Sequence, residues 1–187
     1  MPSTMMTVDG FPIPVGVTGP EKGSVVVLLA AAQQALSAYE PVCQRLHTAM
    51  LRTVAIGYDD RLTAKSVVGI LDALDVQWGV LVGDRAGAEC AWEAAATRLD
   101  RFTGLVVIDR GHPRVPDQYG VILDEDCPPV EINTTVLTSS RAAHAAALAS
   151  RRFVYGDYRI VELLRRRTAA ESTAQLAAEI VLRASTW

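Results

Sequence analysis

The residues best suited to chemistry lie where a short apolar run meets an alanine-rich helical segment. Gly83 and Gly87, four positions apart, flank Arg85, and Asp84 comes directly before Arg85. A glycine pair at this spacing predicts a tight, strained strand-to-helix turn, because it lets the strand and the helix approach closely. The side chain at the centre of such a turn is held at the end of the strand, which is where a nucleophile would be needed.

Other candidate side chains follow further apolar runs. Asp109 ends the run 104–109 and His112 follows it, so an Asp84 nucleophile with a His112 base is one possible catalytic pair. Guanidinium groups form paired hydrogen bonds with carboxylate or phosphate groups, which predicts a site for a small anionic ligand. The arginines at predicted strand ends are Arg85, Arg110, Arg141 and Arg165.

The elements that must position these residues follow from the apolar pattern. Runs without polar alternation predict strands buried on both faces, and apolar residues three and four positions apart predict helices. The predicted strands are 25–29, 53–57, 78–83, 104–109, 133–138 and 153–163, with an edge ribbon in 8–17, and the predicted helices are 39–50, 67–74, 86–99, 142–149 and 169–182. This alternation predicts an α/β fold with a mostly parallel central sheet flanked by helices on both faces. In such sheets ligands bind beyond the carboxyl ends of the strands, where the candidate residues lie.

Composition limits the class of protein. The chain has 187 residues, 50% of them hydrophobic, and a formal net charge of −3. These values predict a single domain over residues 1–187 and no nucleic-acid partner. No apolar run reaches the roughly 20 residues of a membrane span and no secretory signal is recognisable, so we expect a cytoplasmic protein with no membrane partner. Cys43, Cys90 and Cys127 lack metal-ligand spacing, so neither a disulfide framework, a metal site nor a cofactor is indicated.

The order of the segments resembles the α/β-hydrolase family from about Val8 to Asp109, which is more than half of the chain. The matching segments are Val8-Asp9-Gly10 for the opening ribbon, Gly16 to Leu29 for the loop and strand before the oxyanion loop, Tyr39 to Leu46 for the first helix, Val54 to Asp59 for the next strand, Ile70 to Val76 for the helix before the elbow, and Leu99 to Asp109 for the strand after it. The resemblance implies a nucleophile elbow centred on Arg85. In active members it also implies acyl transfer by a nucleophile, a histidine and an acid.

The sequence departs from this family at each position that the chemistry needs. Arg85 stands at the nucleophile position, and a guanidinium has no lone pair with which to attack. The segment Ala30-Ala31-Ala32 replaces the His-Gly pair of the oxyanion loop, and Thr138 to Arg141 holds no carboxylate where the acid usually lies. No histidine follows His144. The proline-rich segment 110–129 is too short for a lid domain, so we expect a shallow, open pocket without a cap.

Three functions remain open from the sequence. The leading hypothesis is a catalytically degenerate α/β-hydrolase-like protein that acts as a binding, regulatory or assembly subunit. Its Arg85 either pairs with an aspartate, which closes the site, or faces an anion. The second is a small serine-independent hydrolase of an ester or related substrate with a displaced site that uses Asp84 and His112, with Asp109 as the acid because some members of the family place an acid after that strand. The third is a homo-oligomeric structural protein whose uncapped face is an interface.

Overall fold

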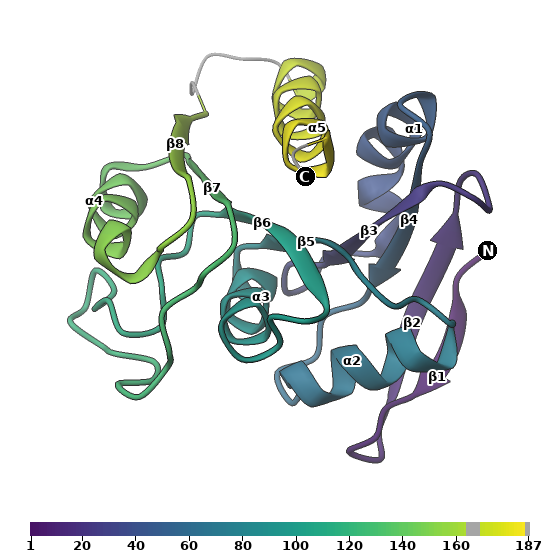
Figure 1. Ribbon diagram of the computed structural model, residues 1–187, viewed down its shortest axis with the longest axis horizontal. Helices are drawn as coiled ribbons and strands as arrows, with labels where there is room; N and C mark the ends of the chain where they lie inside the picture. The colour runs from purple at the N-terminus through teal and green to yellow at the C-terminus, as the bar shows by residue number, and fades with distance from the viewer. Residues whose placement is uncertain (164–168, 186–187) are drawn as a thin grey trace.

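One mixed sheet runs through the molecule (Figure 1), in a computed structural model that describes residues 1–163 and 169–185. The strands are β1 (Ser3–Met6), β2 (Pro12–Thr18), β3 (Ser24–Leu29), β4 (Leu51–Ile56), β5 (Gly79–Asp84), β6 (Phe102–Ile108), β7 (Thr134–Thr138) and β8 (Tyr158–Glu162). Their order in the sheet is β1-β2-β4-β3-β5-β6-β7-β8. β2 pairs antiparallel with β1 and β4, and the other pairs are parallel. The predicted mostly parallel sheet is confirmed.

Helices cover both faces of this sheet, as the alternating pattern predicted. The helices are α1 (Glu40–Thr48), α2 (Ala64–Ala73), α3 (Ala86–Thr97), α4 (Arg141–Ser150) and α5 (Ala169–Ser185). α1 and α5 lie on one face of the sheet, and α2 and α3 lie on the other (Figure 1). One apolar cluster includes Leu46 and Ile180 of α1 and α5, and a second includes Val67 and Trp92 of α2 and α3. None of the described helices is long and apolar enough to cross a membrane.

Side-chain hydroxyls start two of these helices. Thr63 Oγ1 accepts a hydrogen bond from the Ser66 N–H at 3.2 Å at the start of α2. Ser140 Oγ does the same for the Ala143 N–H at 3.1 Å at the start of α4. Each cap satisfies a first-turn N–H that has no partner within the helix. The Ser140 cap begins α4 directly after β7, so the helix starts at the carboxyl edge of the sheet.

A buried arginine fastens α5 to the sheet. The Arg183 side chain is 2% exposed, and its guanidinium donates to Thr135 Oγ1 at 2.8 Å, to the Thr134 carbonyl at 3.0 Å and to Asp157 at 2.8 Å. Buried charges of this kind are tolerated when they are paired and hydrogen-bonded. These contacts hold the end of α5 against the starts of β7 and β8.

The ends of the sheet differ from the sequence prediction. The structure adds β1, which was not predicted. Ser3–Met6 lacks a clear apolar pattern, but it pairs with β2 as an edge strand. The predicted strand 153–163 is shorter, because Arg151–Phe153 forms a 3₁₀ turn, η2, and β8 begins at Tyr158. In both cases the pairing with a neighbouring strand, and not the apolar pattern alone, decides where the strand begins.

Candidate functional site

The predicted turn between β5 and α3 is present and is made by a single residue. Arg85 has φ +48° and ψ −109°, a backbone conformation that costs about 1–3 kcal/mol for a residue with a side chain. The two flanking positions have no room for a residue larger than glycine. A Cβ on Gly83 would lie 2.5 Å from Ala88 Cα, and a Cβ on Gly87 would lie 2.4 Å from the Leu29 carbonyl oxygen. The glycines therefore let α3 cross the ends of β3 and β5, and this crossing holds Arg85 in its strained conformation.

The Arg85 side chain binds its own neighbour. Its Nε donates to Asp84 Oδ1 at 3.1 Å and its Nη2 to Asp84 Oδ2 at 3.3 Å. The Asp84 side chain is 10% exposed, whereas that of Arg85 is 48% exposed. The hydrogen bonds to Asp84 raise the pKa of the Arg85 guanidinium. The arginine at the elbow is thus paired with a buried carboxylate while one side of it still faces solvent.

A buried tyrosine hydroxyl completes this arrangement. Tyr39 donates to Asp84 Oδ2 at 2.7 Å and accepts a hydrogen bond from the Ala31 N–H at 2.7 Å. Burial, together with the adjacent Asp84 carboxylate, raises the pKa of Tyr39, so the hydroxyl keeps its proton. We call Tyr39, Asp84 and Arg85 the elbow network. In this network the Ala31 N–H, which follows β3, donates to the Tyr39 hydroxyl, and both carboxylate oxygens of Asp84 accept hydrogen bonds.

The carboxyl ends of β6 and β7 are joined by a second aspartate. Asp109 has φ +58°, and its carboxylate accepts hydrogen bonds from both the backbone N–H and the hydroxyl of Ser139. Arg110 lies beside it, with Nε 3.4 Å from Glu89 Oε1 of α3 and Nη1 donating to the Asp109 carbonyl at 3.0 Å. Asp109 therefore holds two strand ends together.

The other predicted arginines do not join this group. Arg141 is exposed in the first turn of α4, and Arg165 lies outside the described residues. Of the four predicted anion-binding residues, Arg85 and Arg110 both contact carboxylates in the structure. These pairs leave less positive charge for a small anion at the edge than the sequence suggested.

His112 is buried in the loop that follows β6. Its Nδ1 accepts a hydrogen bond from the Arg114 N–H at 3.2 Å, so Nε2 carries the proton and donates to the Pro128 carbonyl at 2.8 Å. The ring stacks on Phe153 with centroids 4.8 Å apart and meets the Trp92 ring edge-on at 5.5 Å. Burial lowers the pKa of the imidazole. His112 is thus a neutral ring that fixes the loop, and among the described contacts none joins it to Asp84 or Asp109.

Two cavities open at this edge of the sheet. One of about 170 Å³ lies over the first turn of α3 and is lined by Tyr58, Cys90 and the carboxylates of Asp59, Asp60 and Glu89. Hydrogen bonds from Arg61 lower the pKa of Asp59. The second cavity, of about 360 Å³, lies between α4 and the loop that follows β6. The carboxylates around the smaller cavity disfavour an anion there. In the part of the chain that the structure describes, no three His, Cys, Asp or Glu residues are placed to hold a metal ion.

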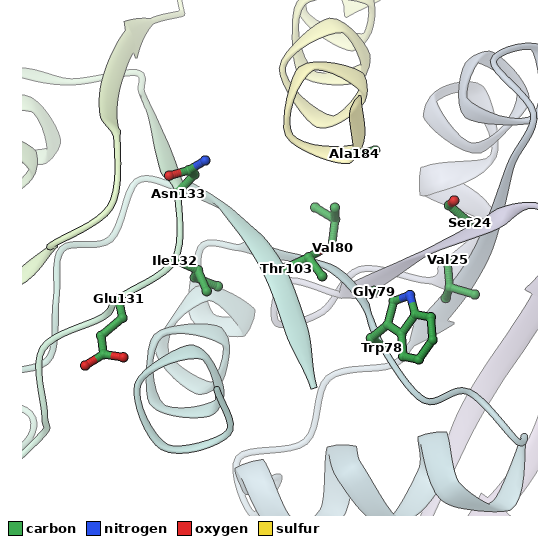
Figure 2. Close-up of a pocket in the computed structure, with 10 residues that line it drawn as sticks. All are labelled: Ser24, Val25, Trp78, Gly79, Val80, Thr103, Glu131, Ile132, Asn133 and Ala184. Carbon is green, nitrogen blue, oxygen red and sulfur yellow. The ribbon is translucent and has the colours of Figure 1, made fainter. Parts of the chain in front are cut away.

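A third cavity, of about 390 Å³, lies at the opposite edge of the sheet (Figure 2). Trp78, Val80 and Thr103 line it near the starts of β5 and β6, and Ala184 lines it from the end of α5. Glu131 is the one ionisable side chain among its described lining residues. No described hydrogen bond joins Glu131 to the hydroxyls of Ser24 or Thr103, so the cavity's described lining residues include no paired nucleophile and base.

Three solved structures described as hydrolases share this architecture. An esterase from Exiguobacterium antarcticum has a TM-score of 0.79 and 12% identity, over 99% of this chain and 100% of that chain. Epoxide hydrolase A from Mycobacterium thermoresistibile has a TM-score of 0.76 and 12% identity, over 95% of this chain and 98% of that chain. A hydrolase from Pseudomonas aeruginosa has a TM-score of 0.76 and 12% identity, over 99% of this chain and 98% of that chain. The chain has the α/β-hydrolase fold. No protein-family model and no curated protein matches the sequence.

Within the α/β-hydrolase fold, Arg85 lies at the centre of the elbow, as the resemblance implied. The described residues between β6 and β7 form turns without a helix, so no cap domain is inserted between these two strands. The sequence analysis did not single out Tyr39 as a site residue. No local signal could have done so, because Tyr39 and Asp84 are 45 positions apart in the sequence and meet through the sheet.

The crossing at the elbow predicts that Gly87→Ala destabilises the fold. The added methyl group would overlap the Leu29 carbonyl, which we expect to lower the free energy of unfolding by about 1–3 kcal/mol in urea titrations. Gly16→Ala in β2 is the matched control, because its nearest neighbour, Leu36 Cδ1, would lie 3.8 Å from the new Cβ. Equal losses in the two variants would contradict this account of the elbow.

The elbow network predicts a specific cost for Tyr39→Phe. Removing the hydroxyl leaves the Ala31 N–H and one Asp84 oxygen without their buried partner, which lowers the free energy of unfolding by about 1–3 kcal/mol. Tyr58→Phe, at an exposed position, serves as the control and should leave the unfolding midpoint unchanged. A Tyr39→Phe variant as stable as the control would show that the two hydrogen bonds add nothing to stability.

The burial of His112 predicts that stability falls in mild acid. The folded-state pKa lies below the ordinary value of 6.5, so the unfolded chain binds this proton more readily. Stability is therefore fully present above about pH 6.5 and decreases as the pH falls below that value. Urea titrations of the native protein and His112→Gln across this range measure the effect. The variant should be less stable at neutral pH but show a shallower decline in acid, and parallel curves would remove His112 as the cause.

Proposed function

We propose that this chain is a non-catalytic protein with the α/β-hydrolase fold that acts as a binding, regulatory or assembly subunit. The elbow network carries the proposal. Arg85 has no lone pair at the nucleophile position, and both oxygens of Asp84 are engaged by Arg85 and Tyr39. The Ala31 N–H, which follows β3 where an oxyanion donor would be needed, is bound to the Tyr39 hydroxyl.

The histidines support the same proposal. A general base must reach the proton that it removes, directly or through one water. Both ring nitrogens of His112 are bound to backbone groups, His47 Nε2 contacts the hydroxyls of Thr18 and Thr53, and His144 Nδ1 lies 3.6 Å from Glu162. None of the three imidazoles has a described contact with Asp84 or Asp109. A base for acyl transfer would therefore require a rearrangement.

A small hydrolase remains the second candidate because the elbow keeps its strained geometry. Backbone strain of this kind gathers at functional sites, and Asp84 is a buried carboxylate directly beside the strained residue. In this alternative, Asp84 would act as the nucleophile after release from Arg85 and Tyr39. His112 would act as the base after its loop opens. The solved structures described as an esterase and an epoxide hydrolase make esters and epoxides the substrates to test.

We expect no turnover of p-nitrophenyl acetate, p-nitrophenyl butyrate or styrene oxide above the buffer rate. Product must be followed beyond one equivalent per chain, since surface groups can react once with an activated ester. Arg85→Ser should be equally inactive, because a serine there would still lack a histidine base. Sustained turnover by the native protein that is lost in both Asp84→Asn and His112→Gln, with folding verified by circular dichroism, would overturn the proposal and establish the displaced site.

A further inference from the structure

The middle of the loop between β6 and β7 forms a compact turn with acidic and apolar side chains. Asp117 Oδ1 accepts hydrogen bonds from the Tyr119 N–H at 2.8 Å and the Val121 N–H at 2.9 Å, and the Asp117 N–H donates to the Val121 carbonyl at 2.9 Å. We call residues 117–126 the acidic tip. These bonds give the tip a defined shape, so its side chains are presented without a large ordering cost on contact.

The acidic tip exposes a run of large apolar side chains. Tyr119 is 81% exposed, and Val121 and Leu123 are each 59% exposed. Glu125 and Asp126 follow them at the surface and have no ion pair in the described part of the chain. A gathered apolar patch with a charged rim is typical of an interaction surface.

An arginine-rich surface lies at the same end of the molecule. Residues 151–155, together with Arg114, form what we call the arginine turn. The guanidiniums of Arg114 and Arg152 lie 5.1 and 4.7 Å from the ring centroid of Phe153, and Tyr155 is 69% exposed. Arg114, Arg151 and Arg152 form no ion pair among the residues that the structure describes. This surface therefore combines unpaired positive charge with exposed aromatic area.

The two surfaces are adjacent and held in a fixed relation. The His112 ring of the loop stacks on Phe153 of the arginine turn, and the Val130 N–H donates to the Phe153 carbonyl at 2.8 Å. The Asp124 N–H donates to the Pro113 carbonyl at 3.1 Å, which ties the tip back to the start of the loop. In Figure 1 the loop lies beside α4 at one end of the sheet.

We propose that two copies of this chain associate through this end, with the acidic tip of each copy on the arginine turn of the other. Adjacent patches of opposite charge on one face are self-complementary under a two-fold rotation, which doubles every contact. The apolar side chains of the tip would then cover Tyr155 and Leu148, and the carboxylates would face the arginines. This inference does not depend on the absence of catalysis, and the ester assay leaves it unaffected.

Charge reversal tests the pairing. Sedimentation velocity over a concentration series should show a reversible dimer of the native chain that weakens as salt is added. The variants Glu125→Lys/Asp126→Lys and Arg151→Glu/Arg152→Glu should each weaken self-association by about tenfold or more, since like charges then face one another. Mixing the two variants should restore the dimer, because each altered surface meets its new complement.

The apolar part of the contact has its own control. Tyr119→Ser/Leu123→Ser should weaken the dimer, whereas Trp78→Ser, which removes an exposed aromatic ring from the opposite edge of the sheet, should leave it unchanged. A native chain that stays monomeric at all concentrations would overturn the proposal. So would a mixture of the two charge-reversed variants that fails to associate, or an effect of Trp78→Ser equal to that of the tip variant.

Discussion

The candidate site depends on how closely α3 crosses the ends of β3 and β5. At Gly83 and Gly87 the backbones leave no room for a Cβ, so the chain must reverse within one residue. That reversal gives Arg85 its positive φ and leaves Asp84 buried at the last position of β5. From there the carboxylate reaches Tyr39, and through Tyr39 the backbone that follows β3. Packing thus sets the site geometry, whichever side chain stands at the centre of the turn.

The electrostatics of the elbow follow from the same geometry. A cation at the start of a helix opposes the helix dipole, which costs roughly 0.3–1 kcal/mol when the group is at the surface. Here Asp84 pairs with Arg85, and Glu89 adds a carboxylate in the first turn of α3. Arg110 in turn contacts Glu89. The result is two ion pairs, Arg85 with Asp84 and Arg110 with Glu89, in which each arginine has a carboxylate beside it.

The sequence predicted the parts of the structure that depend on local pattern. Buried runs such as Val25 to Leu29 identify the central strands, because strands covered on both faces need apolar residues at every position. The glycine frame predicted the elbow, and of the two alternatives left open for Arg85 the structure shows the pair with an aspartate. The Tyr39 bridge and the burial of His112 escaped prediction, because both depend on residues brought together from distant segments. β1 was missed because its exposed edge strand carries no apolar pattern.

The hydrogen bonds of His112 also make it a reporter of the loop. A ring whose Nδ1 accepts and whose Nε2 donates is held in a single tautomer. Its Nε2 proton is enclosed between Pro128, Phe153 and Trp92, so it can exchange with solvent when the loop separates from α3 and η2. The exchange rate of this one proton, which nuclear magnetic resonance can follow, therefore measures how often the uncapped end of the sheet opens.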